Sequence, residues 1–475
     1  MKNKKSEVNN PDIDAGGGYG RVRGCPELCN SQFGDPLRLC FSMFVSAFLA
    51  VWGICGPAFA EKMLIPMDFK QADHLKAYGV AYHALDGGRN IEWLLNYRGG
   101  SFLLDRDGEI TEYALARGVT FELLDTSALA ELDDTIRNSN MSRELLEKAP
   151  KVAVYTPPNL KPWDDAVTLA LTYAEIPYDT LWDEEVFRGD LKKYDWLHLH
   201  HEDFTGQYGK FYGAYRGADW YIQQQLEFEA MARKLGFRKV SDEKKAIAEI
   251  IRAYIESGGF MFAMCSATDS FDIALAARNT DIAGPEFDGD AMDPDCQEKL
   301  DFSRTLAFEN FTLVKDPYVY EFSDIDVTPP TTFANSAAEA MDYFELFEFS
   351  AKYDPVPAML TQCHENPVAG FMGQTTEFRK SLIKKNVVIM GERRTNLSSE
   401  QIGDPGNKSR DAARYIHGNL GKGTWTYLGG HDPEDYRHNV GDPPTQLFLH
   451  KNSAGYRLIL NNVLFPGAKK KELKT

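Results

Sequence analysis

The stretch from Ala253 to Asp272, AYIESGGFMFAMCSATDSFD, constrains the fold of this chain more than any other part of the sequence. Isoleucines at helical spacing lead into it, and Gly258 and Gly259 end that helix because glycine accepts the left-handed geometry found past a helix end. Phe260–Met264 contains no polar residue, which is typical of a central parallel strand covered on both faces. The sequence therefore predicts a helix, a turn, a buried strand and then Cys265 at a strand-to-helix corner.

Strands and helices alternate on both sides of this stretch. Short β runs are expected at Val152–Tyr155, Tyr194–His200, Val387–Met390 and Thr424–Leu428, with helical patterns between the first runs and around Cys265. Such alternation indicates parallel strands joined by right-handed crossovers. The predicted fold class is therefore α/β, with a doubly wound, mostly parallel sheet.

The first 60 residues differ from the rest in composition. Met1–Pro36 is rich in Gly and Asn, Arg38 precedes an apolar run, and Ala58-Phe59-Ala60 offers a small-x-small cleavage site. The run is shorter than the about 20 residues that a membrane-spanning helix needs. We interpret residues 1–60 as a leader with a secretory signal peptide, with a retained anchor as the alternative. The mature protein is then expected to be exported, periplasmic or extracellular, with no stable membrane span.

Two units follow the leader. Residues 61–148 are predicted as a small N-terminal α/β unit, and residues 149–470 as the main α/β domain with an insertion over about 285–385. The insertion lacks the strand–helix alternation and is rich in aromatic residues, so we expect it to cover the mouth of a site. Further elements are predicted as a helical, polar connection over 128–149, strands over 344–349 and 357–361, and a final helix over about 444–464.

Charge and cysteine content narrow the function classes. A net charge of −18 and a pI near 5.1 argue against nucleic-acid binding. Cleavage after Ala60 removes six basic and five acidic residues, which changes the net charge to −19 and leaves only Cys265, Cys296 and Cys363. Three cysteines in an exported protein leave at least one thiol free or intermolecular. If Cys296 and Cys363 pair, Cys265 is the one left over.

Reactive side chains follow the predicted strands at four places. They are His200-His201-Glu202-Asp203, Cys265 with Ser266 and Asp269, Glu392-Arg393, and His431-Asp432 with Glu434. The carboxyl ends of parallel strands share one edge of a sheet, so these groups can converge there.

A cysteine at this edge has a clear chemical use. A helix N-terminus and a nearby imidazolium would lower the pKa of the Cys265 thiol, and the thiolate is the nucleophile. His431 is the expected base, with Glu434 or Asp432 as its orienting group. The remaining reactive groups at the strand ends are expected to bind substrate. The alternative is a buried, inert cysteine.

Two places in the sequence offer possible metal ligands. His198, His200, His201 and the two acids that follow offer imidazole and carboxylate ligands suited to zinc, but hydrogen-bonded or solvated histidines are more common. Asp288-Gly289-Asp290, with two further aspartates, lacks the spacing and final Glu of a calcium loop. We expect no metal and no cofactor.

Two motifs carry a family resemblance. Residues 256–269, ESGGFMFAMCSATD, resemble the glycine turn, strand and elbow of the class I glutamine amidotransferase-like superfamily, and more closely its trehalose-utilisation (ThuA-like) branch. Gly430-His431-Asp432-Pro433-Glu434 is similar to the G-H-D-P-E segment of that branch and to the His-x-Glu of the amidotransferase triad. The resemblance covers about 150–285 and 385–465, and it implies a flavodoxin-like sheet.

The elbow also departs from these patterns. Amidotransferases have G-x-C-x-G, whereas Ala263 and Ala267 stand at the glycine positions here, and the ThuA-like branch commonly has histidine at the elbow. The whole chain resembles exported bacterial proteins that carry the label asparagine synthetase B. A glutamine-dependent synthetase of that type needs a mature N-terminal cysteine and an S-G-G-L-D-S loop, and Ser257-Gly258-Gly259-Phe260 lacks the Asp-Ser that would follow. Glutamine-dependent amide transfer is therefore the weakest hypothesis.

The leading hypothesis is an exported hydrolase-type enzyme that acts on a small polar substrate, a sugar or an amide, through Cys265 and His431, with an oxyanion hole of backbone N–H groups after Cys265. The alternative is a non-catalytic carbohydrate-binding or assembly protein on the same fold. Aromatic residues that would stack on sugar rings are Trp163, Tyr208, Tyr212, Tyr215 and Trp220.

Overall fold

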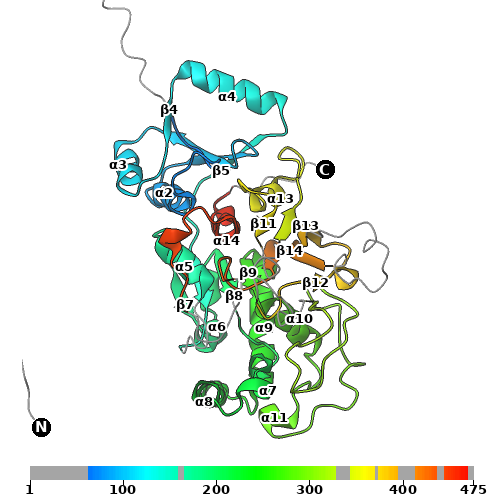
Figure 1. The fold of residues 1–475 in the computed structure, drawn as a ribbon. Coiled ribbons are helices and arrows are strands. Elements are labelled where there is room, and N and C mark those ends of the chain that lie inside the picture. Colours follow the sequence, from blue (N-terminus) through cyan, green and yellow to red (C-terminus); the bar gives the residue numbers. More distant parts are fainter. Residues whose placement is uncertain are drawn as a thin grey trace, which may run out of the picture. The chain divides into compact units, whose positions relative to one another are not determined.

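The fold was analysed in a computed structural model, which describes residues 62–158, 165–199, 201–327, 343–369, 373–393, 412–435 and 443–468 (Figure 1). The predicted signal peptide, His200 and Trp163 lie outside these residues. None of the described helices has the length and apolar character needed to cross a membrane.

The N-terminal unit is built on an antiparallel sheet. Its strands are β1 (Lys62–Ile65), β2 (Ile91–Leu95), β3 (Ser101–Asp105), β4 (Glu122–Leu124) and β5 (Ser142–Leu146), in the order β4-β1-β3-β2-β5. Its helices are α2 (His74–Asp86), α3 (Gly108–Ala116) and α4 (Thr126–Asn138). Asp73, Asp107 and Asp125 cap these three helices by accepting a backbone N–H in the first turn.

The predicted helical connection over 128–149 is only half helical. α4 ends at Asn138, and Ser142–Leu146 forms the edge strand β5, paired with β2. Leu146 and Glu144 of this strand are buried while Leu145 is exposed, which is the alternation of a strand with one covered face.

The main sheet contains ten strands and is parallel over half its width (Figure 1). The parallel strands are β6 (Val152–Tyr155), β7 (Asp179–Leu181), β8 (Trp196–Leu199), β9 (Phe260–Met264) and β15 (Gly423–Leu428), in the order β7-β6-β8-β9-β15. β9 therefore has a parallel neighbour on each side, as its unbroken apolar sequence predicts.

The other half of the sheet is antiparallel, which corrects the expectation of a mostly parallel sheet. Its strands are β10 (Tyr343–Leu346), β11 (Val368–Ala369), β12 (Phe378–Arg379), β13 (Val388–Arg393) and β14 (Ala412–Leu420). Leu420 pairs with Gly423, so only Gly421 and Lys422 join β14 to β15. A two-residue loop permits only an antiparallel hairpin, and Gly421 takes the positive φ (59°) that such a turn requires.

Helices cover both faces of the parallel strands. α5 (Ala166–Tyr173) and α14 (Ala454–Leu464) pack on one face, and α6 (Asp183–Arg188), α8 (Asp219–Lys234), α9 (Val240–Ser257) and α10 (Ala267–Ala276) on the other. Alternate residues of β9 enter the two cores, Phe262 and Met264 the first and Met261 and Ala263 the second. The predicted α/β class is therefore confirmed, and helices cover both faces of the parallel half of the sheet.

Two predicted elements near the C-terminal half differ from the structure. Of the strand predicted over 357–361, residues 357–360 belong to the helix α13 (Pro355–Leu360) and Thr361 is its C-cap; Pro355 stands at the first helical position, which proline favours. The last helix begins at Ala454, because the Ser453 hydroxyl caps it by accepting the N–H of Tyr456.

The insertion is tied to the core at its start. The buried carboxylate of Asp272, on α10, accepts the backbone N–H groups of Leu306, Ala307 and Phe308 at 2.7–2.9 Å. Strands β10, β11 and β12 of the same insertion extend the main sheet. The insertion therefore contributes to the sheet itself, beyond the covering role that its composition suggested.

Candidate functional site

The corner between β9 and α10 holds Cys265 in a strained backbone conformation. Its φ is +52°, in the left-handed region that residues other than glycine rarely adopt. Its N–H donates to the carbonyl oxygen of Gly430 at 3.0 Å, and its Sγ accepts the N–H of Gln374 at 3.3 Å. Backbone strain at a non-glycine residue is stored where the surrounding structure enforces it, most often at functional sites.

The electrostatic setting of Cys265 is opposite to the expected one. The side chain is only 1% exposed, and burial raises the pKa of its thiol to about 12. The negative charges of Asp269 and Asp326 act in the same direction, while the N–H groups of Gln374 and Ser266 oppose the shift. The thiol is therefore protonated at neutral pH, and any attack by sulfur requires a base that removes this proton.

Ser266 and Asp269 lie in the first turn after Cys265 and are fully buried. One carboxyl oxygen of Asp269 accepts the Thr375 hydroxyl at 2.9 Å. Burial, together with the neighbouring charge of Asp326, raises the pKa of Asp269 far above its usual value. The buried carboxyl of Asp269 beside the elbow therefore favours the protonated form more than an exposed aspartate does.

Residues 373–377 form a part of the site that the sequence did not indicate. The Gln374 side chain donates to the carbonyl oxygens of Gly209 and Tyr320 at 2.8 and 3.0 Å, which fixes its backbone N–H against Cys265. Thr375 accepts the N–H of Gly430 at 3.1 Å through its carbonyl oxygen. This segment therefore connects the two motifs found in the sequence.

A buried ion pair lies next to this segment. Arg414, on β14, donates to the Glu377 carboxylate at 2.9 Å, and Arg393 donates to its other oxygen at 3.3 Å. Burial raises the pKa of Glu377 to about 7, and the charge of Arg393 opposes that shift. Of the predicted pair at the end of β13, Arg393 reaches this cluster, whereas Glu392 accepts from Lys380 at 2.6 Å.

The histidines after β8 and β15 come together at the sheet edge. The rings of His201 and His431 lie 5.6 Å apart, centroid to centroid. Loss of contact with water lowers the pKa of His201 to about 4, with Asp165 opposing the shift. His198 bonds through Nδ1 to the Phe262 carbonyl oxygen at 3.1 Å. His201 is thus a neutral imidazole, whereas His198 is engaged inside the sheet.

Glu202 and Asp203 make contacts that stabilise the loop after β8. Asp203 accepts the N–H of Thr205 at 2.6 Å and that of Gly209 at 3.0 Å, which closes the loop after β8. Glu202 lies 3.9 Å from Lys244, inside a buried charged cluster, and burial raises the pKa of Glu202 to about 8. These contacts support the loop that carries His201.

The end of the Gly430–Glu434 segment opens on a pocket of about 330 Å³. Asp432 accepts the backbone N–H of Glu434 at 2.8 Å. The carboxylate of Glu434, the predicted orienting group for His431, lies 2.9 Å from Nδ1 of His450, within hydrogen-bond distance. No sequence pattern indicates this partner, because His450 stands alone in a loop.

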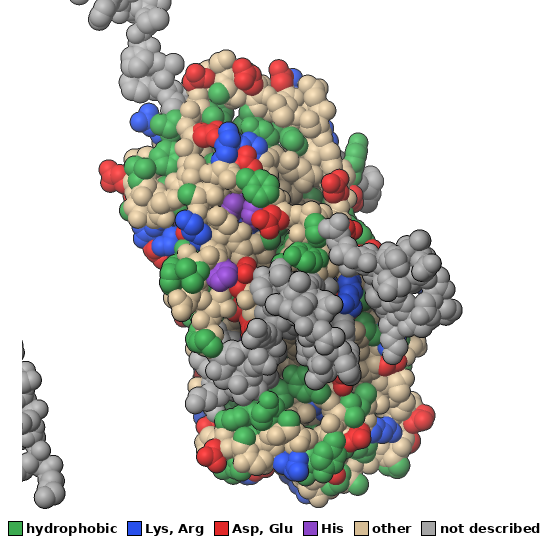
Figure 2. Space-filling model, in the orientation of Figure 1, with side chains coloured by type: hydrophobic (Ala, Val, Ile, Leu, Met, Phe, Trp, Pro, Cys, Tyr) green, Lys and Arg blue, Asp and Glu red, His purple; other side chains and the backbone are tan. Residues whose placement is uncertain are grey.

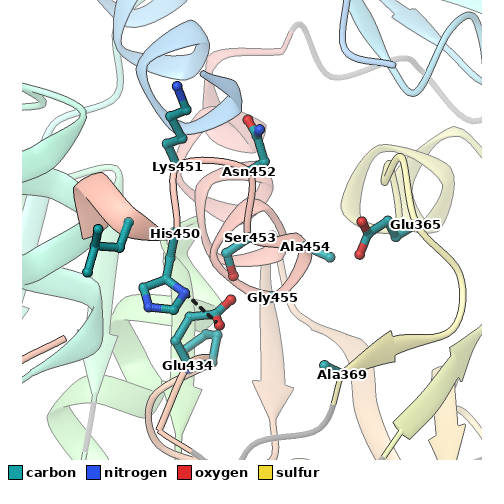
Figure 3. Close-up of a pocket in the computed structure, with 11 residues that line it drawn as sticks. Glu365, Ala369, Glu434, His450, Lys451, Asn452, Ser453, Ala454 and Gly455 are labelled. Carbon is teal, nitrogen blue, oxygen red and sulfur yellow. Dashed lines mark ion pairs between the residues drawn. The ribbon is translucent and has the colours of Figure 1, made fainter. Parts of the chain in front are cut away.

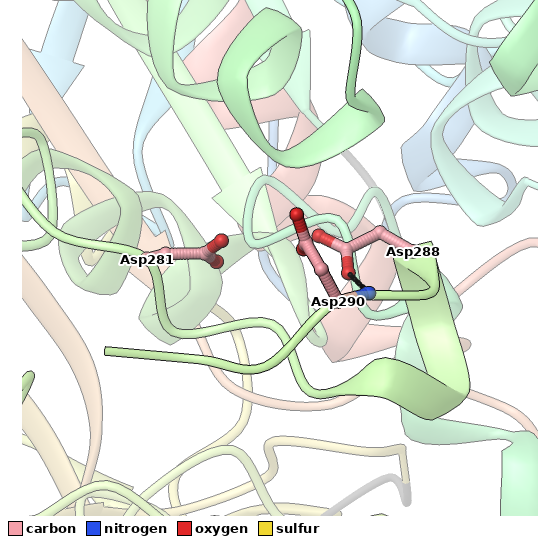
Figure 4. Close-up of side chains that lie close together, drawn as sticks. All are labelled: Asp281, Asp288 and Asp290. Carbon is pink, nitrogen blue, oxygen red and sulfur yellow. Dashed lines mark hydrogen bonds between the residues drawn. The ribbon is translucent and has the colours of Figure 1, made fainter. Parts of the chain in front are cut away.

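Two aspartates of the possible calcium loop, Asp288 and Asp290, surround a lysine together with Asp281. Among the described residues, Asp281, Asp288 and Asp290 are the group whose oxygens lie close enough to share an ion (Figure 4). Lys239 Nζ contacts all three carboxylates, with Asp281 at 2.5 Å and Asp288 at 3.3 Å. An ammonium group thus supplies the positive charge that a metal would bring.

Comparisons with known proteins show similarity only to solved structures. No protein-family model and no curated protein matches the chain. Cytoplasmic Protein STM1381 from Salmonella typhimurium LT2 aligns over 67% of this chain and 100% of its own, at 12% identity and a TM-score of 0.34. Cytoplasmic Protein STM3548 from Salmonella typhimurium has the same coverage and identity and a TM-score of 0.32. A beta-galactosidase from Bacillus circulans sp. alkalophilus aligns over 64% of this chain and 31% of its own, at 11% identity and a TM-score of 0.23.

Proposed function

We propose that the parallel half of the main sheet is a flavodoxin-like domain of the class I glutamine amidotransferase-like superfamily, nearest its ThuA-like branch. The order β7-β6-β8-β9-β15 supports this, since numbering these strands along the chain gives 2-1-3-4-5. The two family motifs also fall where this fold would use them. One forms the elbow after β9 and the other the turn after its neighbour β15.

The proposed activity is hydrolysis of a small polar substrate, a sugar or an amide, by an exported enzyme. One observation carries it: Cys265 stands at φ +52° on a strand-to-helix turn, the geometry of a nucleophile elbow. A structural cysteine in a core has no need of such strain, which costs of order 1–3 kcal/mol.

The proposed chemistry follows from the protonated thiol. With an amide substrate, His431 accepts the proton of Cys265 as sulfur attacks the amide carbonyl carbon, and the imidazolium returns that proton to the leaving amine. Backbone N–H groups after Cys265 stabilise the oxyanion. Water then cleaves the thioester and regenerates the thiol. His201, a neutral imidazole 5.6 Å from His431, does not add a second positive charge to the site.

Trapping of the acyl-enzyme tests this activity. Residues 61–475 would be incubated with small activated esters and amides, quenched in acid, and digested for peptide mass spectrometry. An acyl group on Cys265 that is absent from Cys265→Ser and Cys265→Ala supports the proposal. Acylation restricted to other residues across the whole panel would reject Cys265 as the nucleophile.

Carbohydrate binding is the second candidate, and an aromatic surface favours it. Tyr212, Tyr215 and Trp220 are half-buried on and beside α7 (Tyr212–Tyr215), with the rings of Tyr215 and Trp220 5.3 Å apart. Tyr318 is exposed next to Tyr212, at 5.7 Å between ring centroids. Figure 2 has the orientation of Figure 1, and hydrophobic side chains gather on the lower part of the face it shows, where Figure 1 labels α7. Of the other predicted aromatics, Tyr208 is buried.

Calorimetric titration with neutral sugars separates the two candidates. Binding that survives alkylation of Cys265 and disappears in Trp220→Ala favours a binding protein. Binding that alkylation abolishes places the sugar at the elbow and favours the enzyme.

A further inference from the structure

A histidine–glutamate pair lines the pocket at the end of the Gly430–Glu434 segment (Figure 3). Glu434 Oε2 lies 2.9 Å from His450 Nδ1. A carboxylate on Nδ1 holds the imidazole in the tautomer that carries its proton there, so Nε2 is the atom left to accept a proton. The pair thus has the arrangement of a general base with its orienting group.

This pair differs from the histidines at the elbow in its access to solvent. The side chain of His450 is 37% exposed and that of Glu434 15%, while His431 is buried. Asp432 accepts the N–H of Glu434 and fixes the backbone that carries the carboxylate. The imidazole is therefore oriented by the protein and still reachable by water and a small molecule.

The first turn of α14 lines the same pocket (Figure 3). Ser453 caps the N–H of Tyr456, and the N–H groups of Ala454 and Gly455 belong to the helix positions that have no acceptor within a helix. Such N–H groups favour negative charge. Apolar lining comes from Ala369, Pro433 and Leu449, and polar lining from Glu365 and Lys451.

We propose that this pocket is a second hydrolytic site, in which His450, oriented by Glu434, activates water against a short-chain ester of a polar alcohol. The apolar lining suits the acyl chain, and the polar lining suits the alcohol. The inference goes beyond the function proposed for Cys265, because no step in it uses the thiol.

The reaction balances with water as the only co-reactant. Nε2 of His450 takes a proton from water while the water oxygen bonds to the ester carbonyl carbon. The resulting oxyanion is stabilised by the first-turn N–H groups of α14. Its collapse breaks the bond to the alcohol oxygen, which receives the proton from His450. The products are the carboxylic acid and the alcohol.

Hydrolysis of p-nitrophenyl acetate by residues 61–475 that carry Cys265→Ala tests this site, because this background removes any esterase activity of the elbow. His450→Gln and Glu434→Gln are added to the background and compared with it. General-base catalysis typically contributes 10²–10⁴-fold, so His450→Gln should lower the rate by about tenfold or more. Glu434→Gln should lower it as well. His83→Gln is the matched control, since His83 is 35% exposed and lies 3.6 Å from Glu109.

Each outcome decides the question. Loss of the rate in His450→Gln with retention in His83→Gln, both in the Cys265→Ala background, supports the site. A rate in His450→Gln equal to that of the background overturns it, as does a background rate no higher than that of free imidazole at equal concentration. If only the chain with Cys265 intact is active, the site is overturned and the esterase activity is assigned to the elbow.

Discussion

The N–H of Cys265 donates to the carbonyl oxygen of Gly430 at 3.0 Å, so the elbow after β9 is joined to the turn after β15. The two residues are far apart in sequence but follow neighbouring parallel strands, whose carboxyl ends lie at one edge. Gly430 has a positive φ of 104°, which suits glycine at this turn. The hydrogen bond holds Cys265 in its left-handed conformation and brings the motif containing His431 next to it.

Alkylation across pH tests the buried state of Cys265. Because its pKa is raised to about 12, iodoacetamide should modify Cys265 slowly at pH 8 and faster only as the pH rises well above 9. Peptide mass spectrometry measures the rate at each cysteine, with urea-unfolded protein as the control in which all three sites react. Rapid modification of Cys265 at pH 7 would show a thiolate that the folded structure does not predict.

The same shift has a consequence for stability in alkali. A folded-state pKa above the unfolded value contributes stability that is present below the unfolded pKa, about 8.5, and is lost as pH rises toward the folded pKa. Cys265→Ala should therefore lose less stability than the parent between pH 8.5 and 10.5, by about 1.4 kcal/mol per pH unit at most. Urea unfolding at the two pH values measures the difference. Equal losses would contradict the raised pKa.

The Asp272 carboxylate should be needed to hold Leu306–Phe308 of the insertion in place. Asp272→Asn keeps the size of the side chain but replaces one acceptor oxygen with an amide donor, which faces backbone N–H groups at 2.7–2.9 Å. Loss of a buried charge-assisted acceptor costs about 1.5–3 kcal/mol. Hydrogen exchange should speed up at Leu306–Phe308 in the variant. Exchange unchanged there, with lower global stability, would indicate that Asp272 supports only α10.

Loss of the Glu377 carboxylate should lower the free energy of unfolding strongly, although Glu377 lies in an irregular segment. Glu377→Gln leaves the fully buried Arg414 guanidinium without its carboxylate, and removing one partner of a buried ion pair costs about 3–5 kcal/mol. Arg414→Met combined with Glu377→Gln should recover a large part of that loss, since the buried guanidinium is then removed together with its carboxylate. Thermal unfolding compares the three variants. A double variant as unstable as the single one would indicate that Glu377 acts mainly through Arg393.

The elements that the sequence specifies through local pattern were predicted well. Phe260–Met264 is a five-residue apolar run, and such a run has few solutions other than a central strand. The glycines after α9 and the elbow position of Cys265 follow from that strand.

The parts of the site that escaped prediction depend on long-range contacts. Gln374 reaches the Cys265 sulfur from a segment with no periodicity, more than a hundred positions along the chain. Arg414 lies on β14, and the short turn at Gly421 sets the pairing of β14 with β15. The sequence contains this turn, but it is a weak indication of the pairing. His450 acquires a role only because Glu434 lies next to it in space. Residue type alone does not reveal such pairs.

His417 provides a test of acid stability away from the site. The residue is buried on β14, with Nδ1 3.2 Å from the Thr426 hydroxyl, and burial lowers its pKa to about 4. Below about pH 6.5, His417 takes up a proton in the unfolded chain but not in the folded state. The free energy of unfolding therefore falls as the pH drops from 6.5 toward 4. His417→Gln removes this term and should lose about 2 kcal/mol less than the parent between pH 6.5 and 5, at about 1.4 kcal/mol per pH unit. Urea unfolding followed by tryptophan fluorescence measures both proteins at each pH, and parallel losses in the two would show that His417 is protonated inside the fold.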